Sequence, residues 1–174
     1  MTENYQLFIE KIESDARPRR IRENLAVERL VRRAFGDDAR KYNLPSGAPA
    51  VSVPGRLDPV LSISHSETYA VLVQSLDGSP VGVDIETFRP ALRKVMPKFL
   101  NDDEAAVYGS DDGLLSAWTL KEAAYKAAGK PGLSLLDIHL PLSGDIITLA
   151  DGRRLRIVES QFREGHRLSL VALA

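Results

Sequence analysis

Cysteine is absent from all 174 residues of the sequence. This absence excludes disulfide bonds, thiolate metal sites and a cysteine nucleophile. The sequence also lacks an apolar run of membrane-spanning length, and the stretch Met1-Thr2-Glu3-Asn4-Tyr5 does not have the pattern of a signal peptide. We therefore expect a soluble, cytoplasmic protein without a membrane partner.

An excess of basic charge is also missing, because 23 Lys and Arg residues balance 24 Asp and Glu residues. A general nucleic-acid-binding protein usually carries a basic excess. The balance therefore argues against a nucleic-acid partner, although it allows a local basic patch. The sequence has no Walker-type glycine loop either, which weakens the interpretation as a P-loop nucleotide enzyme.

The pattern of apolar, proline and glycine residues predicts a mixture of helices and strands, and hence the α+β class. Residues 44–59 are rich in Pro and Gly and indicate a loop with a short strand at 51–53. Asn101 and Glu104 have the spacing of a capping box at a helix start. Helices are predicted from about Pro18 to Gly36, from Asn101 onward and over 114–128, and strands over 60–64, 69–75, 81–86, 146–149, 155–158 and 168–173. We expect the strands up to Glu86 to form a meander.

Two motifs carry candidate chemistry. In Val81-Gly82-Val83-Asp84-Ile85-Glu86, apolar residues alternate with others, which places Asp84 and Glu86 on one face of a strand. In the predicted helix over 114–128, Glu122 and Lys126 are four residues apart and share a face. Three carboxylates and a lysine can hold Mg²⁺ against a diphosphate, because magnesium takes few protein carboxylates and leaves room for phosphate oxygens.

Four segments in this order and spacing resemble the 4′-phosphopantetheinyl transferases. They are Ser62-Ile63-Ser64-His65-Ser66, Gly82-Val83-Asp84-Ile85-Glu86, Phe99-Leu100 with Glu104, and Trp118 to Lys126 with Gly129. Any one motif would be weak, since short strings recur by chance, but four in register are strong. The Asp-x-Glu pair and the long gap after it resemble the Sfp-type branch.

The resemblance implies two α+β halves related by a pseudo-twofold axis, with the active site in the cleft between them. We assign residues 1–80 to an N-terminal half that contributes to coenzyme A (CoA) binding and 81–174 to a C-terminal half with the metal site. The implied reaction is Mg²⁺-dependent transfer of the 4′-phosphopantetheine arm from CoA to a serine of an apo acyl- or peptidyl-carrier protein. Such reactions serve fatty acid, polyketide or nonribosomal peptide biosynthesis. We expect a monomer.

Two alternatives to this function stay open. One is a non-catalytic CoA- or carrier-binding protein that retains the fold. The other is a different magnesium-dependent enzyme of nucleotides or diphosphates.

The resemblance also implies roles for individual residues. Asp84, Glu86 and Glu122 are the implied metal ligands. Glu122, Lys126 and His65 are the implied catalytic residues, with Glu122 accepting the proton of the attacking hydroxyl directly or through water. Ordinary explanations exist for the same residues: a solvent-facing strand edge for the acidic pair, a surface ion pair for Glu122 and Lys126, and a strand-end structural role for His65.

CoA binding is implied for a wider set of residues. Lys126, His65 and Ser64 are implied phosphate contacts, and Arg19, Arg20 and Arg22 are candidates for the 3′-phosphate, although a solvated helix face explains these arginines equally well.

Two further segments bear on binding. The family often has a Gly-Lys-Pro segment whose lysine touches CoA phosphate, whereas this chain has Gly47-Ala48-Pro49. Basic and apolar residues are interleaved over 88–99, and we expect this segment to contact the carrier protein.

Overall fold

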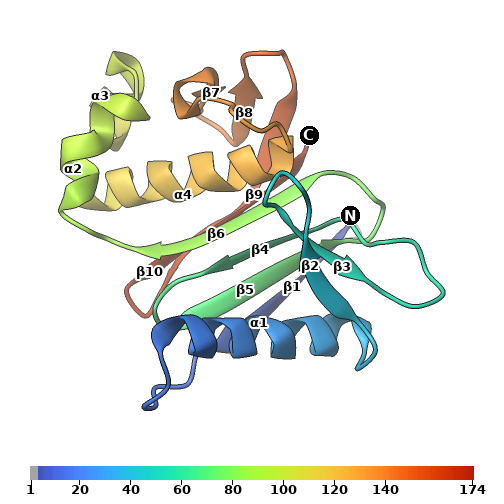
Figure 1. The fold of residues 1–174 in the computed structure, drawn as a ribbon. Coiled ribbons are helices and arrows are strands. Elements are labelled where there is room, and N and C mark those ends of the chain that lie inside the picture. Colours follow the sequence, from blue (N-terminus) through green and yellow to red (C-terminus); the bar gives the residue numbers. More distant parts are fainter. Residues whose placement is uncertain (1–3) are drawn as a thin grey trace.

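Three antiparallel sheets and the helices packed on them form the fold of residues 4–174, which are the residues described by the computed structural model (Figure 1). The predicted α+β class is confirmed. The strands are β1 (Tyr5–Lys11), β2 (Arg40–Asn43), β3 (Pro49–Ser52), β4 (Leu61–His65), β5 (Tyr69–Ser75), β6 (Val81–Thr87), β7 (Ile138–His139), β8 (Ile146–Leu149), β9 (Arg154–Arg163) and β10 (His166–Leu173). The helices are α1 (Arg19–Phe35), α2 (Ala91–Val95), α3 (Asp102–Tyr108) and α4 (Asp111–Ala128), with 3₁₀ turns at Met96–Lys98 and Leu135–Asp137. The stretch Met1 to Tyr5 was expected not to be a signal peptide, and residues 1–3 of it lie outside the described residues.

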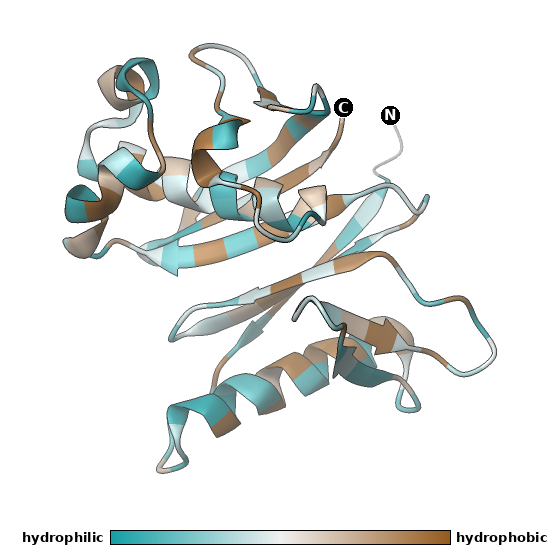
Figure 2. Ribbon diagram, turned by 45° about the horizontal axis from the view of Figure 1, so that its top comes forward, coloured by the Kyte–Doolittle hydropathy of each residue, from teal (hydrophilic) through white to brown (hydrophobic). Residues whose placement is uncertain are grey.

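The N-terminal part of the chain folds around a sheet with the strand order β1-β5-β4. Helix α1 packs on β1 and β5 and contributes Ala26, Val27 and Leu30 to the core. Figure 2 shows alternating polar and apolar bands along α1, as expected of a helix with one buried face. Gly36 ends α1 at the predicted position, with a φ of 96° that favours glycine. Strands β2 and β3 form a separate hairpin. Strand β3 overlaps the short strand predicted at 51–53, whereas β2 precedes the predicted loop over 44–59 and was missed.

The C-terminal part folds around a sheet with the strand order β6-β10-β9-β8-β7, and α4 packs on β6 and β10. The predicted capping box at α3 is confirmed, since the Asn101 side chain accepts the Glu104 N–H and the Glu104 carboxylate accepts the Asn101 N–H. Helix α4 ends at Gly129, which has the left-handed conformation typical of a C-terminal cap. The strands predicted over 146–149 and 155–158 are present as β8 and part of β9, and they pair antiparallel across Asp151-Gly152.

Gly82 sets the distance between β6 and α4. A Cβ atom at this position would lie 1.9 Å from the Ala123 carbonyl oxygen, so only glycine allows the observed approach. Ala123 and Ala127 present the small side chains on the facing side of α4, and both are buried. Since side chains alternate along a strand, Asp84 and Glu86 share the face of Gly82 and lie toward α4.

The two parts repeat one topology. In each part the first strand pairs with the last strand, the last strand also pairs with the strand before it, and the helix packs on the first and last strands. The sheet membership changes between Ser75 and Val81. This repetition is consistent with the expected pseudo-twofold axis, which itself stays a prediction.

The predicted meander through Glu86 is wrong. Strands β4 and β5 do pair as a hairpin, but β6 pairs with β10 rather than with β5. The reason is that β6 belongs to the second sheet, and it contacts the first sheet through side chains. Val71 and Val73 of β5 pack against Val83 and Ile85 of β6 in one apolar cluster.

Within residues 4–174, none of the helices combines the length and the apolar composition needed to span a membrane.

Candidate functional site

A cleft of about 370 Å³ lies between the two parts of the fold. Its walls combine apolar side chains such as Leu61, Ile63 and Tyr125 with charged groups. From the N-terminal part it is lined by Ser46, Gly47, Ala48, Pro49, Leu61, Ser62 and Ile63, and from the C-terminal part by Glu122, Tyr125, Lys126, Gly129, Lys130 and Pro131. The segment Gly47-Ala48-Pro49, singled out in the sequence for its missing lysine, therefore faces the same cleft as Glu122 and Lys126.

Asp84 is the most enclosed acidic side chain beside this cleft. Its residue exposure is 5%, so the solvent-facing interpretation of Asp84 is wrong. Its Oδ1 atom accepts hydrogen bonds from Lys126 Nζ at 2.8 Å and from Ser64 Oγ at 2.7 Å. Its Oδ2 atom is buried and has no hydrogen-bond donor among the described residues. A buried carboxylate oxygen without a partner is costly and requires an explanation, such as an ion that binds there.

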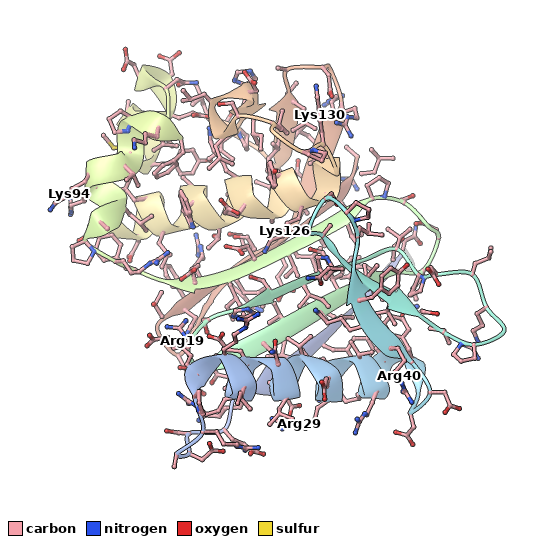
Figure 3. The ribbon with its side chains drawn as sticks, in the orientation of Figure 1. Arg19, Arg29, Arg40, Lys94, Lys126 and Lys130 are labelled. Atoms are coloured by element: carbon pink, nitrogen blue, oxygen red, sulfur yellow. The ribbon has the colours of Figure 1, made fainter. Side chains whose placement is uncertain are left out.

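Lys126 joins the two motifs found in the sequence. Its Nζ atom donates both to Asp84 and to the Val83 carbonyl oxygen at 3.0 Å, and 27% of its side chain is exposed. It does not pair with Glu122 on its own helix, in contrast to the surface-pair interpretation. The close approach at Gly82 makes this contact possible, since it brings α4 within reach of the edge of β6. Figure 3 shows Lys126 at the boundary between the two parts of the fold.

Glu86 and Glu122 complete a group of three neighbouring carboxylates. Burial raises the pKa of Glu122, the negative charges of Asp84 and Glu86 raise it further, and Lys126 opposes both effects. Burial also raises the pKa of Glu86, although Arg89, whose Nη2 lies 3.5 Å from Glu86 Oε1, opposes the shift. Mutual repulsion of this kind is relieved by a bound cation.

The three carboxylates are nevertheless not a preformed metal cage. Over residues 4–174, no group of three Asp, Glu, His or Cys side chains is already arranged to hold a metal ion. The donor set still fits Mg²⁺, because it offers carboxylate oxygens, one of which is buried and unpartnered. The predicted ligands are thus brought together as neighbours, and their role as ligands stays a prediction.

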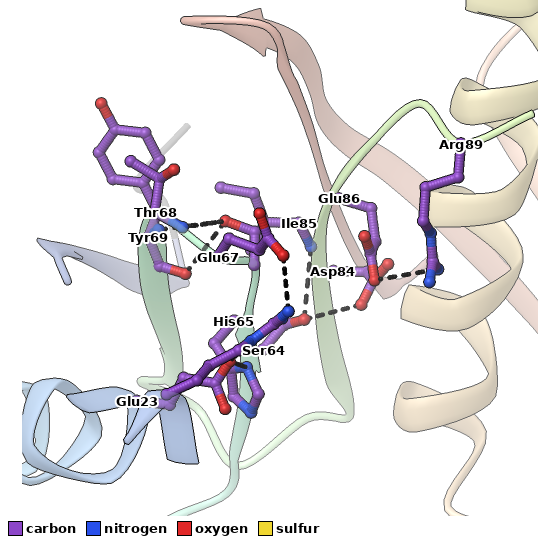
Figure 4. Close-up of polar contacts among 12 residues, drawn as sticks. Glu23, Ser64, His65, Glu67, Thr68, Tyr69, Asp84, Ile85, Glu86 and Arg89 are labelled. Atoms are coloured by element: carbon purple, nitrogen blue, oxygen red, sulfur yellow. Dashed lines mark hydrogen bonds and ion pairs between the residues drawn. The ribbon is translucent and has the colours of Figure 1, made fainter. Parts of the chain in front are cut away.

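His65 lies at the end of β4 beside two acidic residues (Figure 4). Its side chain is 44% exposed, and its Nδ1 atom is 3.6 Å from Oε1 of the buried Glu23. Arg19 donates to Glu23 at 2.5 Å and to Glu67 at 2.7 Å. Glu23 was missed in the sequence, although its spacing of four from Arg19 is the usual signal for a helical ion pair. Any anion that binds to His65 or Arg19 must compete with these carboxylates.

The three arginines expected to hold a 3′-phosphate do not act as one group. Arg19 donates to Glu23 and Glu67, as described above. Arg22 donates to the carbonyl oxygens of Glu13 and Arg17, and so holds the loop before α1. Arg20 is exposed on the helix surface. Of the three, Arg19 alone has side-chain contacts that place it beside the Ser-His-Ser segment.

A buried ion pair behind the site also escaped the sequence interpretation. Lys121, the neighbour of Glu122, is fully buried, and its Nζ atom lies 2.8 Å from Oε2 of Glu104. The spacing of 17 residues between them carries no recognisable signal. Their contact became predictable only once the packing of α3 on α4 was known. The carboxylate of Glu104 faces the core and pairs with Lys121.

Fold and site together define an α+β protein whose two topologically similar parts meet at a cleft lined by Glu122 and Lys126, with the carboxylates of Asp84 and Glu86 beside them. Residues 80–169, just over half of the chain, match the model of the 4′-phosphopantetheinyl transferase superfamily. The chain belongs to this superfamily. The matched region contains Asp84, Glu86, Glu122 and Lys126, whereas His65 lies before it.

One curated relative supports the same assignment. A 4′-phosphopantetheinyl transferase of Bacillus subtilis is 29% identical over 120 residues, which cover 66% of this chain and 49% of the relative. The chain therefore spans about half the length of this relative. The superfamily expected from the sequence motifs is confirmed, and the Sfp-type branch stays a prediction.

Proposed function

We propose that this protein transfers the 4′-phosphopantetheine arm of CoA to a serine of an acyl- or peptidyl-carrier protein, which yields the holo-carrier and 3′,5′-ADP. The observation that carries the proposal is the arrangement around Asp84. Its buried, unpartnered carboxylate oxygen neighbours two further carboxylates and Lys126, and Glu122 and Lys126 line the cleft between the two parts of the fold. Membership of the superfamily supports the same reaction.

Asp84, Glu86 and Glu122 would hold Mg²⁺ in this proposal. Bound Mg²⁺ supplies charge neutralisation to the diphosphate, so that a nucleophile can approach it. Burial raises the pKa values of Glu86 and Glu122, and the charge of Asp84 raises them further, so a bound cation would stabilise the ionised carboxylates.

The reaction itself requires one bond to form and one to break. The oxygen of the carrier serine attacks the β-phosphorus of CoA, and the bond from this phosphorus to the bridging oxygen breaks, so that 3′,5′-ADP leaves. The serine proton passes to Glu122, directly or through water. Glu122 lines the cleft, so its carboxylate can come within reach of the hydroxyl that it would deprotonate.

Lys126 and the apolar walls of the cleft would position CoA. Lys126 Nζ lies where it can offset the negative charge of the departing phosphate. Leu61, Ile63 and Tyr125 provide apolar surface next to it, as expected for a ligand with an aromatic base at one end and phosphates at the other.

Intact mass of an apo-carrier after incubation with the protein, CoA and Mg²⁺ tests the proposal. We expect the carrier to gain the mass of one phosphopantetheine group, and EDTA to prevent the gain. Glu122→Gln should lower the rate by at least about 100-fold, because it removes both the charge and the base. Glu28→Gln, an exposed change on α1, serves as the matched control.

Three results would each overturn part of the proposal. A carrier that keeps its mass while binding the protein would favour the non-catalytic alternative. Transfer that is insensitive to EDTA would argue against the metal. A Glu122→Gln variant as fast as the Glu28→Gln control would remove Glu122 from the mechanism.

A further inference from the structure

Ser64 was expected from its motif to contact CoA, but its hydroxyl forms hydrogen bonds with two residues of β6. Its Oγ–H donates to Asp84 Oδ1 at 2.7 Å, and the same oxygen accepts the Ile85 N–H at 3.4 Å. The residue is buried, with an exposure of 8%. Figure 4 shows these contacts crossing from β4 to β6.

A serine hydroxyl has a single hydrogen to donate. In this structure that hydrogen is committed to a carboxylate, and hydrogen bonds to ionised groups are the stronger kind. A phosphate of CoA could receive it only if Asp84, which is 5% exposed, lost one of its donors. The exchange would leave a buried carboxylate with less hydrogen bonding, which is unfavourable.

The two carboxylate oxygens of Asp84 differ in the number of hydrogen bonds that they accept. Ser64 and Lys126 both donate to Oδ1, and no donor among the described residues reaches Oδ2. Two donors that converge on one oxygen fix the orientation of the carboxylate and leave the other oxygen as the available ligand. Outer residues commonly orient metal ligands in this way.

We infer that Ser64 is a positioning residue, which holds Asp84 so that Oδ2 is available to the divalent cation, rather than a direct contact to CoA. The inference rests on the proposed function, because the cation belongs to that proposal. It concerns a residue that acts through another, so loss of transfer alone would not test it.

Ser62 provides a matched control. It is two residues earlier on β4, and its Oγ accepts the Val83 N–H at 3.1 Å, so it also joins β4 to β6 through a hydroxyl. It has no contact with Asp84. Ser62→Ala and Ser64→Ala therefore remove equivalent contacts between the two strands, and only Ser64→Ala removes a hydrogen bond to Asp84.

The experiment measures Mn²⁺ binding to the full chain by electron paramagnetic resonance, with and without CoA, and CoA binding in EDTA by calorimetry. Ser64→Ala should weaken Mn²⁺ binding about 10-fold or more, the usual effect of losing an outer hydrogen bond to a ligand. Ser62→Ala should leave Mn²⁺ binding unchanged, and Ser64→Thr, which retains the hydroxyl, should restore most of the affinity. CoA binding in EDTA should be the same for the wild type and both Ser64 variants; because Ser62 lines the cleft, its variant serves as a control for Mn²⁺ binding alone.

The opposite results are equally clear. If Ser64→Ala binds Mn²⁺ like the wild type but binds CoA more weakly in EDTA, Ser64 is a CoA contact and the inference is wrong. If both alanine variants weaken Mn²⁺ binding equally, the effect belongs to the junction of the strands and the inference is wrong. Failure of the wild type to bind Mn²⁺ in either condition would overturn the metal site together with the inference. A wild type that binds Mn²⁺ but transfers nothing would overturn the proposed reaction alone.

Discussion

The buried pair of Lys121 and Glu104 gives the strongest prediction for stability. Their side chains are 0% and 2% exposed, and their charged atoms are 2.8 Å apart. Glu104 also accepts the N–H groups of Asn101 and Leu140, and Lys121 Nζ donates to the Leu135 carbonyl oxygen. The pair therefore ties α3, α4 and the segment after α4 to one another. Burial lowers the pKa of Lys121, and the carboxylate of Glu104 opposes this shift.

Lys121→Met removes the ammonium group and keeps most of the side-chain volume. The Glu104 carboxylate then stays buried with two N–H donors but without a cation, and the Leu135 carbonyl oxygen loses its donor. Breaking a buried pair from one side costs about 3–5 kcal/mol. Domains of this size are stable by roughly 5–15 kcal/mol, so the variant should lose a large fraction of its stability.

Removal of both charges should be much less harmful. In the double variant Lys121→Met with Glu104→Gln, no charge stays buried, so the loss should be at least about 2 kcal/mol smaller than the sum of the two single losses. Arg93→Met is the control, because Arg93 and Asp111 form a pair that is 57% and 48% exposed. Such a surface pair contributes about 0–1 kcal/mol.

Urea denaturation followed by circular dichroism measures all four variants. The free energies of unfolding give the coupling energy of the pair, provided that the denaturant slope stays the same. Single variants that each cost under about 1 kcal/mol, or a double variant whose loss equals the sum of the single losses, would refute the reasoning.

Three further predictions concern the cleft and its surroundings. Ala48→Lys adds a cation to the cleft wall and should lower KM for CoA by roughly threefold to tenfold with little change in kcat, because the gain from a charge-assisted hydrogen bond is partly offset by lost side-chain entropy. Comparison of CoA with 3′-dephospho-CoA shows which phosphate the new lysine reaches. An unchanged KM for both compounds would exclude the contact. Charge reversal of the exposed Lys94 and Lys98 should raise KM for the carrier protein and leave KM for CoA unchanged. Steady-state kinetics at two salt concentrations measure both constants. A carrier KM that is unchanged and independent of salt would exclude these lysines from the carrier contact. Burial raises the pKa of Glu122 above its ordinary 4.5, so the stability lost through Glu122 grows as pH rises above about 4.5 and is complete above the folded pKa. Glu122→Gln should therefore raise the Tm in EDTA at pH 7, and this gain should vanish below about pH 4.5 in thermal scans. A lower Tm at pH 7 would contradict the cause given for the shift.

Local signals in the sequence predicted most of the elements around the site. The alternation through Asp84 and Glu86, the capping box at Asn101 and the glycine after α4 all act over a few residues, and the structure has each of them. Strand β1 was missed, and β6 was assigned to the wrong sheet. Pairing between strands depends on residues distant in the sequence, and no local pattern specifies it.

The same distinction holds for the candidate site. The carboxylates and Lys126 were recognised as a group from their motifs, but the contact of Lys126 with Asp84 depends on how closely α4 approaches β6. The contact of Ser64 with Asp84 and that of Glu23 with His65 could not be foreseen for the same reason. The sequence identified the residue types that the chemistry needs, and the packing decided which of them touch.

The hydroxyl contacts between β4 and β6 have a consequence for solubility. Each of these strands is the outermost strand of its sheet on this side, so each would present a row of unpaired backbone groups to solvent if the other were removed. Exposed edges of this kind recruit other chains and lead to aggregation. In the intact protein, Ser62 and Ser64 occupy the space where a strand from another molecule would otherwise pair. The two parts of the fold thereby protect each other from self-association, while the cleft between them stays open to a ligand.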